Sequence, residues 1–280
     1  PFNILAKPTG AICNLDCTYC FYLRKEELYP GTSKFRMSDA VLEAYTRNYI
    51  NNQPAGSPEV NFAWQGGEPT LMGLDFFKRA IELQQQYVRT GMRITNSLQT
   101  NGTLINDEWA GFLAEHDFLT GVSIDGPAEL HDHYRVSKGG RPTFERVVRG
   151  VEYLRKHKAE FNTLTVVNNI NAPHPEEVYN LLKDFGSTFL QFIPIVEPMD
   201  GKMAEYSVCS KQYGTFLNGI FDEWIARQDI GKIYIQHFDM MLGIVMGHPA
   251  FLCVHAETCG SNLAIEHNGD VYSCDHYVNP

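Results

Sequence analysis

Cysteine residues are the part of this sequence with the clearest chemical potential. Three of them, Cys13, Cys17 and Cys20, lie within the run CNLDCTYC. Thiolates held this close on one loop can bind a metal ion or an iron–sulfur cluster. A structural zinc ion needs four protein ligands, whereas a [4Fe–4S] cluster takes one thiolate per iron, so three cysteines would leave one iron open to a substrate or cofactor. A zinc knuckle and three buried thiols are the simpler alternatives.

A second group of cysteines, Cys253, Cys259 and Cys274, lies near the end of the sequence. The run HNGDV before the last of them predicts a turn between two short strands, which would bring Cys259 and Cys274 together. Three thiolates do not complete a four-ligand cluster. A zinc ion held with His255 or His276 is the alternative, because mixed Cys/His zinc sites are common.

Two further features could contribute polar groups. The run Gln65-Gly66-Gly67-Glu68-Pro69 combines a glycine pair, which lets the backbone approach a ligand closely, with a carboxylate that could accept hydrogen bonds from an ammonium group. On its own, this run predicts no more than a turn. Asp275 directly follows Cys274 and would point where that ligand loop points, although a lone aspartate more often caps a helix or forms an ion pair.

Composition limits the class of protein. The 280 residues carry a net charge of −10 and 44% are hydrophobic, which excludes a disordered chain and disfavours nucleic-acid binding. No apolar run of about 18 residues could span a membrane, and the first residues do not resemble a secretory signal. An odd number of cysteines argues against a disulfide framework, and we interpret Cys209 as a buried small side chain. We expect a cytoplasmic protein.

These residues must be positioned by the surrounding elements, and apolar runs alternate here with helical patterns. We predict strands at 2–6, 60–64, 93–99, 119–124, 164–168 and 189–193, and helices at 39–51, 74–90, 107–115, 143–158 and 175–185. Such alternation favours a parallel sheet covered by helices, closed into a barrel or part of one. The glycine-rich and polar clusters follow strands, where such folds place their chemistry.

The alternation of strand and helix patterns ends after residue 193. Helices are predicted at about 211–227 and 235–246, followed by the second cysteine segment. We place a soft boundary near 198–202, which divides the chain into a barrel domain, 1–200, and a C-terminal part, 201–280, made of a helical linker and the cysteine segment.

The first cysteine loop, with Tyr19 before its last cysteine, resembles the cluster loop of radical S-adenosylmethionine enzymes, and Gln65–Pro69 is similar to the glycine–glycine–glutamate motif of that family. The resemblance implies a partial (β/α)6 barrel, a [4Fe–4S] cluster on Cys13, Cys17 and Cys20, and S-adenosylmethionine at the open iron. It further implies that Gly66, Gly67 and Glu68 hold the methionine amino group, that Ser123 and Arg135 contact polar groups of the cofactor, and that Tyr19 packs near the adenine.

The C-terminal segment resembles the start of a SPASM auxiliary-cluster domain, and several stretches are similar to anaerobic sulfatase-maturating enzymes. These stretches are 100–106, 123–135 and 253–275. The resemblance implies one or two auxiliary [4Fe–4S] clusters, with Cys253, Cys259 and Cys274 among the ligands and the others beyond residue 280, so that the sequence would be truncated.

The implied reaction is the oxidation of a cysteine or serine of a sulfatase polypeptide to Cα-formylglycine, with Asp275 as the general base. An electron donor such as flavodoxin or ferredoxin would supply the reducing electron. Tyr22, Gln65 and Gln99, near predicted strand ends, are candidates for hydrogen bonds to the substrate backbone. The alternatives are another radical peptide maturase, which forms thioether or carbon–carbon bonds, and a non-enzymatic zinc or iron–sulfur protein.

Overall fold

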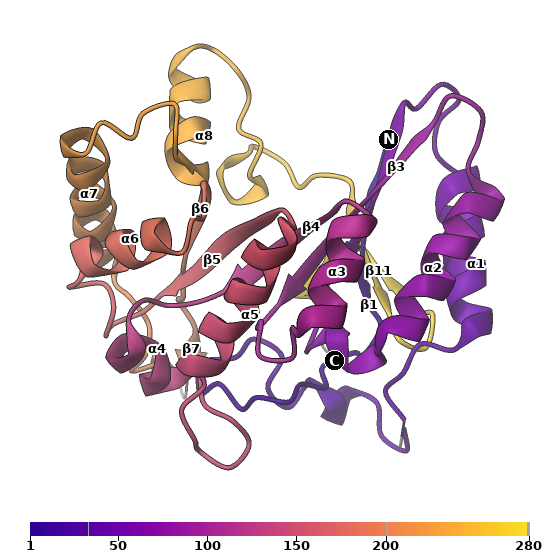
Figure 1. The fold of residues 1–280 in the computed structure, drawn as a ribbon, viewed down its shortest axis with the longest axis horizontal. Coiled ribbons are helices and arrows are strands. Elements are labelled where there is room, and N and C mark those ends of the chain that lie inside the picture. The colour runs from indigo at the N-terminus through magenta and orange to yellow at the C-terminus, as the bar shows by residue number, and fades with distance from the viewer. Residues whose placement is uncertain (33, 200, 279–280) are drawn as a thin grey trace.

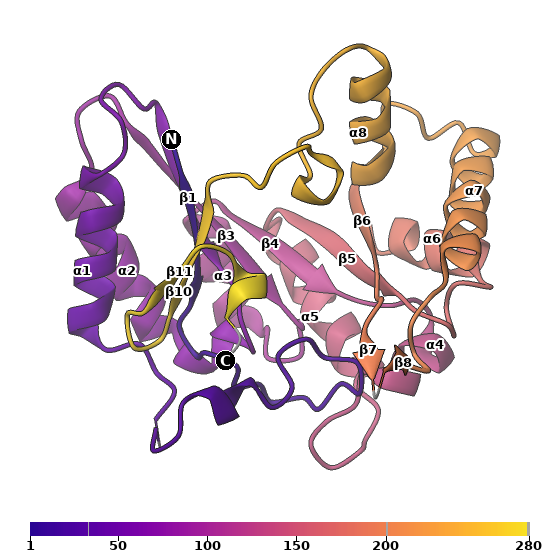
Figure 2. The same cartoon turned by 180° about the vertical axis from the view of Figure 1, so that it is seen from behind.

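A nine-stranded, mostly parallel sheet organises the chain (Figures 1 and 2). The computed structural model describes residues 1–32, 34–199 and 201–278. The strand order is β11-β10-β1-β2-β3-β4-β5-β6-β9, and only β11 runs antiparallel to its neighbour. The strands are β1 (Asn3–Lys7), β2 (Glu59–Trp64), β3 (Arg93–Thr100), β4 (Phe118–Ser123), β5 (Phe161–Val167), β6 (Phe189–Pro194), β9 (Tyr234–Ile235), β10 (Asn262–Glu266) and β11 (Val271–Tyr272). A separate small hairpin pairs β7 (Pro198–Met199) with β8 (Lys202–Met203).

Helices cover one face of the sheet and leave the other face open to the loops that follow the strands (Figures 1 and 2). The α-helices are α1 (Asp39–Asn51), α2 (Leu74–Tyr87), α3 (Asp107–Glu115), α4 (Ala128–Tyr134), α5 (Phe144–His157), α6 (Pro175–Asp184), α7 (Ser210–Ala226) and α8 (Gln236–Val245). Short 3-10 turns lie at Lys25–Leu28, Pro69–Met72, Cys253–His255 and Asp275–Tyr277. In the described part of the chain, no helix combines the length and apolar character that crossing a bilayer requires.

Side chains fix the beginnings of the helices. Ser38 accepts a hydrogen bond from the amide of Val41 and so begins α1, and Asn106 does the same for α3 through the amide of Trp109. Such caps satisfy amides that lack a partner in the first turn. The predicted strand–helix alternation is confirmed, and the predicted bounds of α3 match the observed ones.

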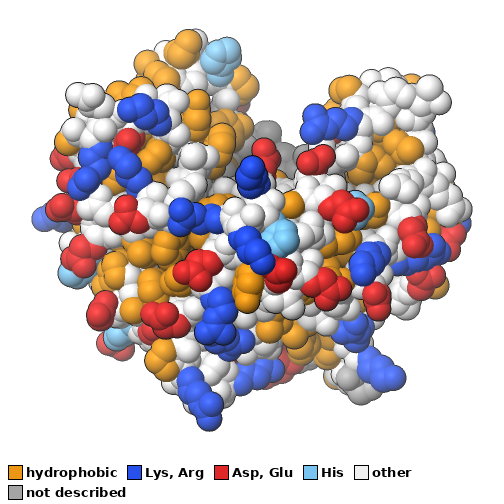
Figure 3. All heavy atoms as spheres, in the orientation of Figure 1, with side chains coloured by type: hydrophobic (Ala, Val, Ile, Leu, Met, Phe, Trp, Pro, Cys, Tyr) orange, Lys and Arg blue, Asp and Glu red, His pale blue; other side chains and the backbone are white. Residues whose placement is uncertain are grey.

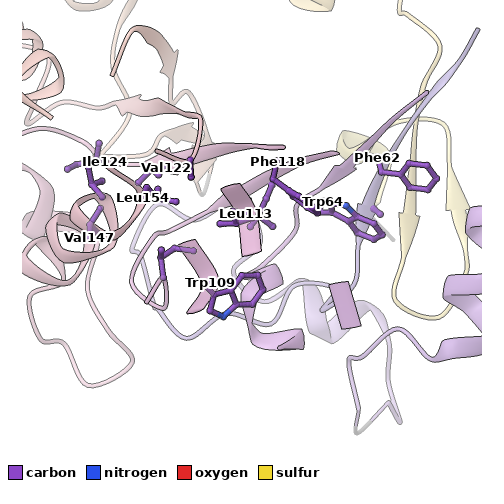
Figure 4. Packing of buried hydrophobic residues seen from close by; sticks show 14 of the residues in the cluster. Phe62, Trp64, Trp109, Leu113, Phe118, Val122, Ile124, Val147 and Leu154 are labelled. Atoms are coloured by element: carbon purple, nitrogen blue, oxygen red, sulfur yellow. The ribbon is translucent and has the colours of Figure 1, made fainter. Parts of the chain in front are cut away.

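An aromatic cluster joins the helices to the middle of the sheet. Phe62, Trp64 and Phe118 extend from strands into the core, where Trp109 of α3 also lies (Figure 4). Phe77 of α2 lies at their centre, with ring centroids 5.6 Å from Trp64 and 5.4 Å from Trp109. Truncating one such buried ring to alanine typically costs about 3–5 kcal/mol. This packing fixes β2, β3 and β4, whose ends carry the functional loops.

The structure differs from the expected elements in two places. Residues 128–134, which we interpreted as a loop before Arg135, form the short helix α4. The C-terminal hairpin of β10 and β11, which we placed in a separate part of the chain, extends the main sheet, because β10 pairs in parallel with β1 and aligns Lys7 with Glu266. Residues after 200 therefore supply both edges of the sheet, through β9 and β11.

Candidate active site

The three cysteines of the first motif line a cavity at the carboxyl ends of the parallel strands. The cavity has a volume of about 220 Å³. Its other lining residues come from the ends of β2, β3, β4, β5 and β6 and from the cysteine loop, and they include Tyr19, Tyr22, Gln65, Gly66, Gly67, Gln99, Asn101, Ser123 and Arg135. The topology thus gathers at one cavity most of the site residues that the sequence predicts.

An amide network holds Cys13 in place. Asn101, just after β3, donates from Nδ2 to Asn14 Oδ1 at 2.9 Å and to Cys13 Sγ at 3.5 Å. Asn14 in turn donates to Thr103 Oγ1 at 2.9 Å. The amide of Leu15 also donates to Cys13 Sγ at 3.3 Å. Donors aimed at sulfur favour the thiolate form that a metal requires.

Backbone pairing fixes the remainder of the cysteine loop. The amides of Asp16 and Thr18 donate to the carbonyls of Val136 and Tyr134 at 2.8 and 3.0 Å. Leu15 also forms an isolated bridge with Ser137. The loop is therefore held against the segment that follows α4.

The environment of the cysteines suits a bound metal centre. Burial is the main cause that raises the pKa of Cys13 to about 11 and that of Cys17 to about 12, so a positively charged centre is needed to keep these sulfurs deprotonated at neutral pH. All three cysteines line the same cavity, so each thiolate can take one iron of a cluster placed there.

The glycine pair allows two loops to pack backbone against backbone. A Cβ atom on Gly67 would lie 2.1 Å from the carbonyl oxygen of Ile12, and one on Gly66, whose φ is +107°, would lie 2.7 Å from that of Gly10. The amide of Gly67 donates to the Gly10 carbonyl at 2.8 Å, and the amide of Glu68 donates to the Ile12 carbonyl at 2.9 Å. Only glycine permits this approach, so the motif positions the cysteine loop as well as lining the cavity.

Glu68 is fixed by hydrogen bonds from residues of two segments of the chain. Its carboxylate is fully buried and accepts four hydrogen bonds, from the amide and hydroxyl of Thr70, the hydroxyl of Thr100 and the amide of Asn101, at 2.5–3.0 Å. Burial raises the pKa of Glu68, and these hydrogen bonds oppose the shift. The carboxylate does not line the cavity. It therefore holds Asn101, the residue that contacts Cys13, while its expected contact with the amino group of the cofactor stays a prediction.

A buried ion pair connects the cysteine loop to the end of β4. Asp125 is fully buried, accepts a hydrogen bond from the Tyr19 hydroxyl and lies 3.0 Å from Arg135 Nε. The amide of Val166 donates to the other oxygen of Asp125 at 3.1 Å. Burial alone would lower the pKa of Arg135, but Asp125, Tyr19 and Cys17 together outweigh burial and the pKa is raised. Arg135 thus stays charged at the cavity, with its guanidinium carbon 5.6 Å from the centre of the Tyr19 ring.

The remaining polar residues line the cavity opposite the cysteines. Gln99 donates from Nε2 to Ser123 Oγ at 3.1 Å, which links the ends of β3 and β4. Gln65, at the end of β2, also lines the cavity. The ligands that these three side chains contact remain predictions.

Asp275 reaches the cavity through Tyr22. The Tyr22 hydroxyl donates to Asp275 Oδ2 at 2.7 Å, and Lys7 Nζ lies 2.8 Å from Asp275 Oδ1. The same ammonium lies 2.5 Å from Glu266 Oε1 and is almost fully buried. Burial and then Asp275 raise the pKa of Tyr22 well above its usual value, so its hydroxyl remains a donor. Asp275 is thus an ion-pair partner of the buried Lys7 and contacts Tyr22, which lines the cavity.

The C-terminal cysteines lie around the hairpin. Cys253 and Cys259 are exposed and Cys274 is partly exposed. Antiparallel pairing of β10 with β11 places Cys259 and Cys274 at the open end of the hairpin, since they precede the first strand and follow the second. Their role as cluster ligands remains a prediction.

The sequence analysis did not assign four residues that shape the site: Lys7, Asn14, Asn101 and Asp125. Asn101 directly follows β3 and Asp125 lies two residues after the end of β4, and these positions are a usable signal. Lys7 ends β1 after an apolar run, and nothing in the sequence near it indicates a partner 259 residues away.

Comparisons with known proteins agree with this geometry. Residues 8–182 match the radical SAM superfamily. The serine-type anaerobic sulfatase-maturating enzyme of Bacteroides thetaiotaomicron is 45% identical, over all of this chain and 70% of that protein. The cysteine-type enzyme of Clostridium perfringens is 40% identical, over 99% of this chain and 75% of that protein.

Solved structures give the same result. Native anSMEcpe with bound AdoMet has a TM-score of 0.88 and 40% identity, and covers 100% of this chain with 76% of its own. The same protein with AdoMet and the Cp18Cys peptide has a TM-score of 0.84 and 39% identity, over 100% of this chain and 75% of that one. Because the superfamily match exceeds half of the sequence and the identity extends along all of it, the chain belongs to the radical SAM superfamily and, within it, to the anaerobic sulfatase-maturating enzymes.

Proposed function

We propose that this chain oxidises a serine or cysteine of a sulfatase polypeptide to Cα-formylglycine, with Asp275 as the base that receives the side-chain proton. The observation that carries the assignment of Asp275 is its position between the Tyr22 hydroxyl and the Lys7 ammonium, at 2.7 and 2.8 Å. A carboxylate held at two points keeps one geometry toward a substrate, which efficient proton transfer requires.

Cys13, Cys17 and Cys20 would hold a [4Fe–4S] cluster, and the cavity beside them would hold S-adenosylmethionine. Together these groups supply a one-electron oxidant that removes a hydrogen atom from the substrate Cβ. The backbone of Gly66 and Gly67 approaches the cavity without side chains in the way. Ser123, Arg135 and Tyr19 provide a hydroxyl, a cation and an aromatic face for the polar and ring portions of the cofactor.

Asp275 takes the proton of the substrate hydroxyl or thiol as the Cβ–H bond is lost. Serine oxidation removes one hydrogen atom, one proton and one further electron, and the product is the aldehyde. Oxidation of cysteine gives a thioaldehyde, which water converts to the aldehyde with loss of sulfide. Cys253, Cys259 and Cys274 are the proposed ligands of an auxiliary cluster, which would supply an acceptor for the further electron.

The substrate is proposed to enter along the polar wall of the cavity. Gln65, Gln99 and Tyr22 offer amide and hydroxyl groups there, suited to a peptide backbone. A related enzyme has been solved with a peptide bound, which supports a peptide as the substrate class. A flavodoxin or ferredoxin is the proposed source of the reducing electron.

Anaerobic turnover tests the proposal. The reconstituted protein is incubated with S-adenosylmethionine, a chemical reductant and matched sulfatase-derived peptides that carry serine or cysteine at one position. Mass spectrometry should detect loss of two hydrogens from the serine peptide or conversion of the cysteine peptide to the same aldehyde. Thioether or carbon–carbon cross-links without aldehyde would indicate a different peptide maturase.

A further inference from the structure

The cysteine loop separates two hollows. Besides the inner cavity, Cys13, Cys17 and Cys20 line a second hollow of about 90 Å³ on the outer side of the loop, together with Asp16, Arg24, Glu26 and Lys138. The cysteines thus line both the inner cavity and a second hollow whose other lining residues include exposed ones.

Exposed cations surround this outer hollow. Arg24 and Lys138 line it, Arg141 lies on the same turn as Lys138, and Lys34 lines a neighbouring hollow that shares Ile12 with it. None of these four side chains has an ion-pair or hydrogen-bond partner among the described residues. Two carboxylates, Asp16 and Glu26, lie among them. We call Arg24, Lys34, Lys138 and Arg141 the basic rim.

Backbone pairing places part of the rim beside the cysteine loop. A bridge from Leu15 to Ser137 ties the turn of Lys138 and Arg141 to that loop, and a bridge from Val136 to Pro142 closes the turn. Arg24 follows Cys20 by four residues and adopts a φ of +67°, which is uncommon for a residue other than glycine.

The basic rim stands out against the acidity of the whole molecule. The chain carries a net charge of −10. In Figure 3, Lys and Arg side chains gather along the lower edge, and Figure 1 places the cysteine-loop segment at that edge. A local positive field on an acidic protein orients an acidic partner and raises its association rate.

We infer that the outer face of the cysteine loop, bounded by the basic rim, docks the acidic one-electron carrier protein that reduces the cluster. The inference rests on the proposed function, in which S-adenosylmethionine and the peptide occupy the inner cavity and leave the outer face for the electron. The carrier is oxidised by one electron and the cluster is reduced by one. Small, transient, charge-guided contacts are typical of electron-transfer pairs.

The test measures binding of a flavodoxin to the reconstituted enzyme by anaerobic calorimetry at low ionic strength. The double variant Arg24→Glu/Lys138→Glu should bind about tenfold more weakly. Glu26→Gln should bind more tightly. The control variant Lys158→Glu/Lys232→Glu changes the net charge equally. Its residues precede β5 and β9 and so lie at the amino-terminal ends of the strands, away from the cysteine loop. Its affinity for flavodoxin should match that of the wild type.

Turnover separates this inference from the proposed function. With dithionite as reductant, the double variant should form aldehyde at the wild-type rate. With reduced flavodoxin it should be slower, and added salt should narrow the difference. Equal flavodoxin affinity of the double variant and the wild type would overturn the docking surface, as would a raised KM for peptide with unchanged flavodoxin affinity. Absence of aldehyde with dithionite in the wild type would instead contradict the proposed function.

Discussion

At the scale of single residues, the main feature is the way in which two carboxylates share one buried lysine. Lys7 lies between Asp275 and Glu266. Lys7 contacts Oδ1 of Asp275 and the Tyr22 hydroxyl contacts Oδ2, so the carboxylate is oriented at both of its oxygens.

Replacing the proposed base tests this view. Asp275→Asn keeps the size of the side chain and removes its basicity. We expect formylglycine formation to fall by about 10²–10⁴-fold, the usual contribution of a positioned base. Binding of S-adenosylmethionine should change little. The measurement is the rate of aldehyde formation at saturating peptide.

A matched control uses an aspartate of the same hairpin. Asp270 is exposed and its carboxylate interacts only locally, with Asn268. Asp270→Asn should retain the wild-type rate. If Asp275→Asn also did so, Asp275 would not be the base.

Glu68 is expected to act on stability through Asn101. In Glu68→Gln, the amide nitrogen would face either the Asn101 N–H or the three donors at the other oxygen, so at least one buried donor loses its partner. The free energy of unfolding should fall by about 2 kcal/mol. Urea unfolding of the metal-free chain measures it, with the exposed Glu152→Gln as the control that should lie within about 0.5 kcal/mol of the wild type. An equal effect of the two substitutions would contradict the role assigned to Glu68.

Spacing predicted the cysteine loop and the glycine pair, because local chemistry fixes both. All five polar residues that the sequence singled out around the site, Tyr22, Gln65, Gln99, Ser123 and Arg135, line the cavity, but only Gln65, Gln99 and Ser123 lie at strand ends. The sequence did not predict how Glu68 is engaged or that Lys7 pairs with Asp275. Those contacts depend on which strands pair in the sheet, and residue types alone do not indicate that pairing.

At the scale of elements, the glycine turn after β2 is the joint between the cysteine loop and the sheet. Gly67→Ala would place a Cβ 2.1 Å from the carbonyl oxygen of Ile12, so the backbone of one loop must move. We expect loss of most reconstituted iron per chain, measured by iron and sulfide analysis. Gly214→Ala, in α7 with open space around it, should keep its iron and gain up to about 1 kcal/mol in stability. Full iron content in Gly67→Ala would show that the close packing is not required.

The junction of β1 with β10 should give stability that depends on pH. His267 and Lys7 together outweigh burial and lower the pKa of Glu266 from its usual 4.5. A lowered folded-state pKa gives stability that is present above the unfolded value and is lost as the pH falls through the folded one. Glu266→Gln should therefore cost about 3 kcal/mol at pH 7 and progressively less below about pH 4.5.

Urea unfolding of the metal-free chain at pH 7 and pH 4 measures this difference. Glu59→Gln is the control, because Glu59 faces Arg93 at 3.8 Å on the surface and should have a small effect at both values. A cost of Glu266→Gln that is the same at both pH values would contradict the assigned ion pair.

Periodicity predicted the long elements well and the short ones poorly. Helices α1 and α3 begin at side-chain caps, and α5 has an amphipathic pattern that ends at Lys158, which adopts a left-handed conformation. Helix α4 has only seven residues between Pro127 and Arg135, too few for a period to be detected. The parallel pairing of β10 with β1 joins residues 3–7 to 262–266, and no local signal could indicate it.

At the scale of the whole molecule, the cysteine loop lines two hollows, the proposed cofactor cavity and the proposed docking face. The inner cavity faces the strand ends, and the outer hollow faces the surface. The chain covers 70% of the length of its relative from Bacteroides thetaiotaomicron, and within that length it contains the cavity, the proposed base and the proposed docking face.

Isotope transfer tests the central claim most directly. The reconstituted enzyme is incubated anaerobically with S-adenosylmethionine, reductant and a sulfatase-derived serine peptide deuterated at Cβ. The account predicts that deuterium appears in 5′-deoxyadenosine in proportion to the formylglycine formed, and that both products vanish when Cys13, Cys17 and Cys20 are replaced by alanine. Formylglycine formed with no deuterium in 5′-deoxyadenosine, or formed equally by the cysteine variant, would contradict it.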